Sequence, residues 1–211
     1  MKKQCTRKRW VLWACLAVAV LAVAAAAAYV ISTIPSYPAF YKDVNSLEAI
    51  HRELKEMEDI CAPEASWLGL TDGTYQLKMD GRFQDAEPEG YYIKGTIQCN
   101  DIGVSVSISG LPRARKTALN GVQYRDVTIE YEVCGERTEN GVTSELANAE
   151  FDLYGYSYAI YTDYPVEAMS EEDRETIRST LKDWALEIAH QIIDTTCGKN
   201  VANRKDWGDG T

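Results

Sequence analysis

Side chains that could carry nucleophilic or proton-transfer chemistry are sparse in this chain of 211 residues. It holds only two histidines, His51 and His190, and both fall in stretches with helical apolar spacing. A Ser-His-Asp or Cys-His site needs a histidine placed by tertiary structure, and a packed or surface histidine is the commoner outcome. No G-x-S-x-G, H-E-x-x-H, Walker A or G-x-G-x-x-G motif is present. The sequence therefore identifies no catalytic residue.

Carboxylates are abundant, with 32 Asp and Glu against 22 Lys and Arg and a net charge of -10. Two carboxylates can hydrolyse a glycosidic bond, so a hydrolase of cell-wall or glycan material stays open as an alternative. No pair stands out, because Glu130 and Glu132 fit a solvated strand face and residues 171–173 fit the first turn of a helix. Residues 206–210 lack the ligand spacing of a calcium loop. We expect no metal, cofactor or nucleic-acid partner.

A row of tyrosines is the candidate binding surface. Tyr154, Tyr156 and Tyr158 alternate along a predicted strand over residues 151–161, which places them on one face. Such a row could stack against a glycan or a peptide if that face is open. It could equally pack beneath helices with its hydroxyl groups at the rim.

Four cysteines follow the N-terminal segment: Cys61, Cys99, Cys134 and Cys197. An even number in an oxidising compartment predicts two disulfides. Cys61 and Cys197 end predicted helices that cover the same sheet, so we expect Cys61 to pair with Cys197, and Cys99 with Cys134. Free buried thiols are the alternative.

A sheet and two helices are needed to position these residues. Period-two alternation of apolar with Ser, Thr or Glu residues predicts half-buried antiparallel strands. The predicted strands cover residues 74–83, 91–99, 104–109, 127–133 and 151–161. Turn dipeptides punctuate them, among them Asn140-Gly141. A helix is expected from Asn45, with Glu48 completing a capping box, to Cys61, and another from Ser170, with Asp173, to about Gly198.

The first 35 residues resemble a membrane-targeting segment. Five basic residues precede an uncharged run from Trp10 to Ile34: Lys2, Lys3, Arg7, Lys8 and Arg9. The run is long enough to cross a hydrocarbon core of about 30 Å, and the basic end belongs on the cytoplasmic side. We expect a retained signal-anchor, with a cleaved signal peptide and a secreted domain as the alternative.

The sequence thus predicts an α+β protein with an N-terminal transmembrane helix and a two-layer domain. In that domain an antiparallel sheet of five or more strands is covered by an N-terminal and a C-terminal helix. The expected segments are a cytoplasmic basic segment 1–9, a signal-anchor 10–34, a stalk 35–42, an exported domain 43–198 and a polar tail 199–211.

The predicted function is that of a single-pass membrane protein outside the cytoplasm. Its exported domain is expected to be a non-catalytic module that binds an envelope protein, a peptide or cell-wall glycan. The alternatives are the membrane-tethered carboxylate hydrolase and a structural subunit of a membrane assembly, in which the apolar helix itself makes the contacts.

Overall fold

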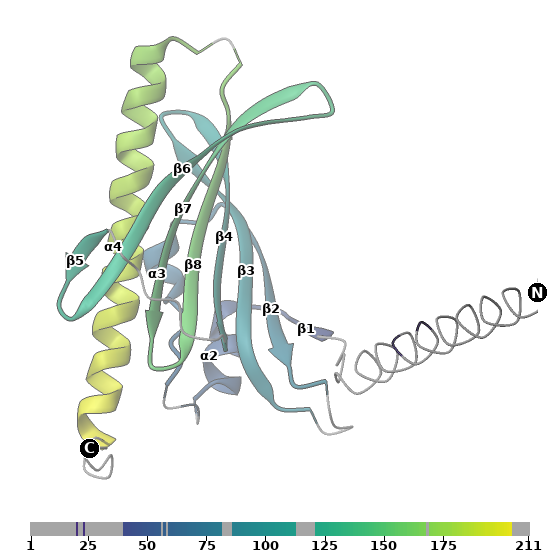
Figure 1. Cartoon of the computed structure of the whole chain (residues 1–211), viewed down its shortest axis with the longest axis vertical. Helices are drawn as coiled ribbons and strands as arrows, with labels where there is room; N and C mark the ends of the chain where they lie inside the picture. The colour runs from purple at the N-terminus through teal and green to yellow at the C-terminus, as the bar shows by residue number, and fades with distance from the viewer. Residues whose placement is uncertain are drawn as a thin grey trace, which may run out of the picture. The chain divides into compact units, whose positions relative to one another are not determined.

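Alternating apolar and polar residues form one antiparallel sheet of eight strands in this computed structural model (Figure 1). The structure describes residues 40–55, 57, 59–81, 86–112, 121–167 and 169–203, with Val20 and Val23, and side chains as far as residue 198. The strands are β1 Phe40–Val44, β2 Asp72–Met79, β3 Pro88–Cys99, β4 Ile102–Pro112, β5 Val122–Tyr124, β6 Val127–Glu139, β7 Val142–Leu153 and β8 Tyr156–Pro165.

The strands form two meanders that meet at the centre of the sheet. Their spatial order is β1-β2-β3-β4-β8-β7-β6-β5, and every described neighbour is antiparallel. After β4 the chain passes to the far edge and returns strand by strand until β8 pairs with β4. The meeting of β4 with β8 therefore joins segments far apart in the sequence.

Two-residue turns with positive φ make the tight returns. Asn140 and Gly141 have φ of 52° and 82° between β6 and β7, and Tyr154 and Gly155 have 50° and 84° between β7 and β8. Positive φ at both positions matches the type I′ hairpin. The first turn was predicted from its Asn-Gly dipeptide. The second divides the predicted strand 151–161, so that prediction was wrong.

One long helix, α4 (Glu171–Asn203), runs along the sheet (Figure 1). The main-chain N–H of Asp173 donates to Ser170 Oγ over 3.1 Å, and Ser170 Oγ donates to Asp173 Oδ2 over 2.6 Å. Ser170 therefore caps the helix, as predicted. The cap stabilises the helix because it satisfies an amide that has no partner within the helix. The helix continues through Gly198, where it was expected to end.

The N-terminal helix is shorter than expected. It is α2 (Leu47–Glu53), and a four-residue α3 (Ala65–Leu68) follows it. Ser46, rather than Asn45, caps α2 by accepting from the N–H of Ala49 over 3.2 Å. The cap lies one residue later than predicted, and the helix ends well before Cys61.

Two apolar clusters fill the space between the sheet and the helices. The larger contains Ile50 of α2, Ile93 of β3 and Ile188 of α4, and the smaller contains Val104 of β4 and Leu181 of α4. Full burial of each such side chain stabilises the fold by about 1.5–3 kcal/mol. All three described helices therefore pack on the same side of the sheet.

An ion pair holds the first half of α4 on the sheet. Glu145 of β7 has only 3 % of its side chain exposed and accepts from Arg178 Nη2 over 2.6 Å and from Arg178 Nε over 2.8 Å. The Tyr164 hydroxyl donates to the same carboxylate over 2.5 Å. The Arg178 hydrogen bonds lower the pKa of Glu145, and Tyr164 adds to this effect.

These elements correct the predicted fold class. The domain is an eight-stranded antiparallel sheet with one long C-terminal helix, and not a sheet covered by an N-terminal and a C-terminal helix. A seven-residue α2 spans about 10 Å, which is too short to cover strands of 12 residues such as β3.

The predicted transmembrane helix is also corrected. Among the described residues, no helix is long and apolar enough to cross a membrane. The run from Trp10 to Ile34 lies outside those residues except for Val20 and Val23, which are helical. The chain divides into two units, Met1–Pro38 and Ala39–Thr211, and every strand and helix above belongs to the second.

Candidate functional site

The sheet has a face on which none of the described helices packs. Along β4, Val104, Val106 and Ile108 are buried on the helix side, whereas Ser105 and Ser107 point the other way and Ser105 is exposed. We call this second side the open face. Its exposure follows from the helices all lying on the opposite side.

A cleft of about 690 Å³ lies on the open face. Sites for small ligands commonly occupy about 300–1,000 Å³. Six residues of the lining present a hydroxyl group on this face: Thr74, Tyr92, Thr96, Ser105, Ser107 and Tyr161. The charged lining residues are Asp72, Lys94, Arg137 and Asp163.

Strand register arranges these side chains in two rows across the sheet. One row of cross-strand partners is Asp72, Thr96, Ser105 and Asp163, and the next is Thr74, Lys94, Ser107 and Tyr161. Neighbouring strands lie about 4.8 Å apart. Beneath the rows, β3, β4 and β8 are paired on both sides, whereas Asp72–Thr74 of β2 pair with β3 alone, because the pairing with β1 ends at Tyr75. Over β3, β4 and β8 a ligand therefore meets side chains.

Tyr161 presents an aromatic ring at the cleft. The residue is 39 % exposed, and its hydroxyl donates to Glu150 Oε1 over 2.8 Å. Asn148 Nδ2 donates to the same oxygen over 3.1 Å. The second ring of the lining, Tyr92, has the Lys94 ammonium 5.4 Å from its centroid. The hydrogen bond to Glu150 thus holds Tyr161 in a fixed orientation.

A β-bulge decides which side chain of β6 reaches the cleft. The register between β6 and β7 shifts between Val133 and Gly135, and Gly135 has φ of 104°. The extra residue, Cys134, reverses the alternation of faces beyond it. Val133, just before the bulge, lies on the helix side. Each residue beyond the bulge lies on the face opposite to the one that simple alternation would give it.

The two residues after the bulge tie the hairpin to opposite faces. Glu136 Oε1 accepts from Arg174 Nη1 of α4 over 2.7 Å, and Arg137 Nη2 donates to Asp163 Oδ2 over 2.9 Å. The Arg137–Asp163 ion pair closes one end of the cleft. Without the bulge, the alternation would turn Arg137 toward α4.

The cleft carboxylates are poorly spaced for glycoside hydrolysis. Three strand spacings separate Asp72 from Asp163, so their Cα atoms lie roughly 14 Å apart. A hydrolytic pair has its carboxyl groups about 5–9.5 Å apart, a range that these two side chains would enter only by leaning fully toward each other across β3 and β4. Asp163 is also paired with Arg137. The arrangement favours holding a ligand over cleaving it.

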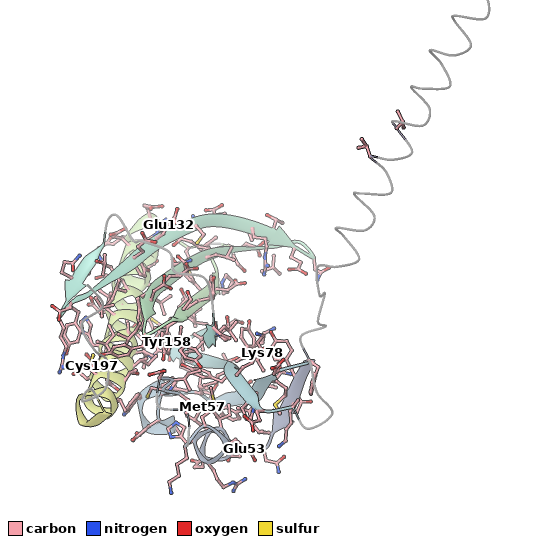
Figure 2. The ribbon with its side chains drawn as sticks, turned by 60° about the horizontal axis from the view of Figure 1, so that its bottom comes forward. Glu53, Met57, Lys78, Glu132, Tyr158 and Cys197 are labelled. Atoms are coloured by element: carbon pink, nitrogen blue, oxygen red, sulfur yellow. The ribbon has the colours of Figure 1, made fainter. Side chains whose placement is uncertain are left out.

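The predicted tyrosine row lies on the helix side. Tyr158 is fully buried, and Figure 2 shows it in the interior between the strands and α4. Tyr156 begins β8 and is half-buried, and Tyr154 lies in the turn, where its hydroxyl is 3.9 Å from Cys197 Sγ. Burial raises the pKa of Tyr158. These rings pack beneath helices, which was the second outcome considered, and their face is not open.

The predicted disulfides are corrected, because none of the four described cysteines, Cys61, Cys99, Cys134 and Cys197, forms a disulfide. Three strands lie between β3, which carries Cys99, and β6, which carries Cys134. That separation is roughly 19 Å, whereas a disulfide needs Cα atoms within about 7 Å. Cys61 donates its thiol hydrogen bond to the Ala62 carbonyl oxygen over 3.4 Å instead.

The two histidines take structural positions. His51 Nε2 donates to the Pro63 carbonyl oxygen over 3.1 Å. The His190 ring stacks on Tyr124 with the ring centroids 3.8 Å apart. Neither lines the cleft.

The remaining candidate residues lie elsewhere. Glu130 and Glu132 belong to β6 and are not part of the cleft lining. Figure 2 labels Glu132 on that strand. Residues 171–173 form the first turn of α4, and residues 206–210 lie outside the described part. Among the described residues, no group of three or more His, Cys, Asp or Glu side chains could hold a metal ion.

Sequence reasoning missed the cleft although it found the alternation that builds it. The polar faces of the strands at 104–109 and 127–133 were noted, but Thr96, Ser107, Arg137 and Tyr161 were not singled out. Thr96 and Ser107 share one signal, which is a small hydroxyl residue facing away from the apolar side of its strand. That signal is weak, because any solvated strand face shows it.

Comparison of the chain with protein-family models, with curated proteins and with solved structures gave no match.

Proposed function

We propose that this domain is a non-catalytic binding module whose ligand occupies the cleft on the open face. The observation that supports this best is the cleft itself, which combines about 690 Å³ with an ordered lining of hydroxyl groups. Side chains held by strand register are pre-organised, so less conformational freedom is lost when a ligand binds.

The carboxylate geometry supports binding over hydrolysis. Asp72 and Asp163 are separated by three strand spacings, and Asp163 forms an ion pair with Arg137. The Asp163 oxygen that contacts Arg137 is thereby occupied, and no second carboxylate of the described residues lines the cleft on a neighbouring strand. We expect a ligand to leave the cleft chemically unchanged.

The location of the domain is a further part of the proposal. We place it outside the cytoplasm, at the cell envelope, on the basis of the basic residues and the uncharged run at the start of the chain. A secreted form follows if that segment is cleaved.

Blocking the cleft tests the proposal. Ser105 is exposed at the centre of a cleft row, so Ser105→Trp should fill the cleft without burying a new group in the core. Ser179→Trp is the matched control, because Ser179 is exposed on α4 and lies outside the cleft. Thermal unfolding of both variants verifies that the fold is kept.

The readout is NMR titration of the full chain with three probes: a mixture of neutral oligosaccharides, hexalysine and oligogalacturonate. Saturable shifts at the amides of Lys94, Ser107 and Tyr161, lost in Ser105→Trp and kept in Ser179→Trp, support the proposal. If no probe perturbs these amides, or if Ser105→Trp leaves the shifts intact, the cleft is not a binding site. Release of shortened oligosaccharides, abolished by Asp72→Asn, would establish the hydrolase instead.

A further inference from the structure

We infer that the ligand of the cleft is a neutral, polyhydroxylated chain, that is, a segment of glycan. This rests on the proposed binding function and adds the chemical class of the ligand. It follows from charge balance, the kind of hydrogen-bonding groups, the pairing of the strands beneath, and the exposed ring of Tyr161.

The charges of the cleft balance, although the protein is acidic. Asp72 and Asp163 face Lys94 and Arg137 in the lining, whereas the whole chain has a net charge of -10. Arg137 contacts Asp163 over 2.9 Å and also Glu139, outside the lining, over 3.5 Å. An anionic ligand would meet Asp72, and a cationic ligand would meet Lys94. Either contact would cost binding free energy through like-charge repulsion. A neutral ligand avoids both.

The hydrogen-bonding groups match those of a sugar. A hydroxyl group can donate one hydrogen bond and accept two, and Thr96, Ser105 and Ser107 place such groups side by side on adjacent strands. Sugar hydroxyls have the same dual capacity. The side chains can therefore pair with a sugar in either direction, and the two rows follow the length of a chain-like ligand.

The pairing of the strands disfavours a peptide. An extended peptide commonly binds by adding its main chain to an unpaired sheet edge. The cleft lies mostly over β3, β4 and β8, each of which has a neighbour on both sides, whereas its margin at Asp72–Thr74 of β2 is paired with β3 alone. A peptide lying across β3, β4 and β8 would leave much of its main chain without partners from the sheet, and unsatisfied buried amides are costly.

Tyr161 provides a surface for the apolar face of a sugar ring. It is 39 % exposed while its hydroxyl is held by Glu150. An aromatic ring with an apolar body and an anchored polar end suits a partner that is apolar on one face and polar at its rim. We expect one sugar ring to lie on Tyr161 while its hydroxyl groups reach Ser107.

A panel of neutral oligosaccharides tests the inference on the full chain. The probes are linear hexamers of glucose in α-1,4 and β-1,4 linkage, of mannose, and of β-1,4-linked N-acetylglucosamine, with hexalysine and oligogalacturonate as charged comparisons. We expect at least one neutral hexamer to bind at the cleft by calorimetry and by amide shifts at Ser107 and Tyr161. Tyr161→Ala should weaken that binding about tenfold, equivalent to about 1.4 kcal/mol.

Two further variants separate the ring from the fold. Tyr161→Phe retains the ring and should stay within about threefold of the wild type, equivalent to about 0.7 kcal/mol. Tyr41→Ala removes a tyrosine that is 45 % exposed and lies outside the cleft, and it should leave binding unchanged. If Tyr161→Ala fails to fold, Ser107→Ala and Thr96→Val test the binding of the glycan at the cleft instead, because each removes a cleft hydroxyl group.

Three other outcomes would overturn the inference, and they can be distinguished from one another. Cleft binding by hexalysine or oligogalacturonate, with no neutral hexamer bound, overturns the glycan assignment but leaves the binding module. Binding of a neutral hexamer that survives Ser105→Trp and Tyr161→Ala places the glycan elsewhere. Absence of cleft shifts with every probe overturns both the inference and the proposed function.

Discussion

Tyr91 and Tyr158 hold the same residue of the chain, Cys61, from two different strands. The Tyr91 hydroxyl donates to the Cys61 carbonyl oxygen over 2.9 Å, and the Cys61 main-chain N–H donates to the Tyr158 oxygen over 3.3 Å. The Tyr158 hydroxyl in turn donates to the Asp59 carbonyl oxygen over 3.3 Å. Both tyrosines are fully buried. The segment between α2 and α3 is therefore fastened to the centre of the sheet.

Removing one of these hydroxyl groups should destabilise the domain. Tyr91→Phe leaves the buried Cys61 carbonyl without that donor, and an unsatisfied buried group costs about 1–3 kcal/mol. Urea unfolding followed by circular dichroism measures the change. Tyr41→Phe is the control, because Tyr41 is 45 % exposed, and it should change stability by less than about 0.5 kcal/mol. Equal stabilities of Tyr91→Phe and the wild type would show that the hydrogen bond contributes nothing.

Gly110 makes room for the same two rings. It is the cross-strand partner of both Tyr91 and Tyr158, and an added Cβ would lie 2.7 Å from the Tyr91 ring and 3.0 Å from the Tyr158 ring. Gly110→Ala should therefore displace a ring and cost about 1–3 kcal/mol through overpacking. Gly103→Ala is the comparison, because its nearest neighbour would be 3.6 Å away. A lower melting temperature for Gly103→Ala than for Gly110→Ala would contradict this account.

The Glu145–Arg178 pair should make stability depend on acidity. Because the folded-state pKa of Glu145 is lowered, its contribution is complete above the unfolded-state pKa of about 4.3. It is lost as the pH falls through the lower folded-state value. Glu145→Gln should cost about 2 kcal/mol at neutral pH and flatten the loss of stability below about pH 4.3. Urea midpoints from acidic to neutral pH measure both effects.

A matched control for this pair is Glu171→Gln. Glu171 also contacts Arg178, at 2.8 Å, but its side chain is 74 % exposed, so its removal should cost less than about 1 kcal/mol. A larger effect from Glu171→Gln than from Glu145→Gln would mean that burial does not govern the strength of these pairs.

Arg137 should affect ligand choice more than stability. Its ion pair with Asp163 has side chains 55 % and 27 % exposed, so Arg137→Gln should cost at most about 1 kcal/mol. The change leaves Asp163 without its partner arginine, and hexalysine should then bind the cleft more tightly, most clearly at low salt. Calorimetry with hexalysine and a neutral hexamer measures the shift.

Arg174→Gln controls for the shape of the hairpin. Arg174 binds Glu136 over 2.7 Å on the helix side of the same hairpin and does not line the cleft. The variant Arg174→Gln should leave ligand preference unchanged. An equal gain of hexalysine affinity in both variants would assign the effect to the hairpin as a whole.

Cys134 should report the location of the domain. Of the four described cysteines, none of which forms a disulfide, it is the exposed one. Partial burial raises the pKa of its thiol, and Glu132 and Glu150 add to the shift, so labelling is best done at about pH 8. A membrane-impermeant maleimide should label intact cells that carry the full chain, and Cys134→Ser should remove the signal. Labelling that requires lysis would place the domain inside the cell.

The sequence alone determined the local elements whose signals are contained in a few neighbouring residues. The cap of α4 at Ser170, the turn at Asn140-Gly141 and the alternating strands around residues 104–108 were all predicted, because each depends on contacts within one turn or along one strand. The α2 cap was predicted one residue early, since Asn45 and Ser46 are both suitable capping residues.

The tertiary structure decided which strands are neighbours and which face is covered. Alternation shows that a strand has two unlike faces, but it does not show that β4 meets β8 or that all the described helices pack on one side. The bulge at Cys134 reverses the faces of Glu136 and Arg137, and only pairing with β7 reveals it. The tyrosine row was visible in the sequence, but the packing of α4 buried it. The cleft exists because long-range strand register placed Thr96, Ser107 and Tyr161 together.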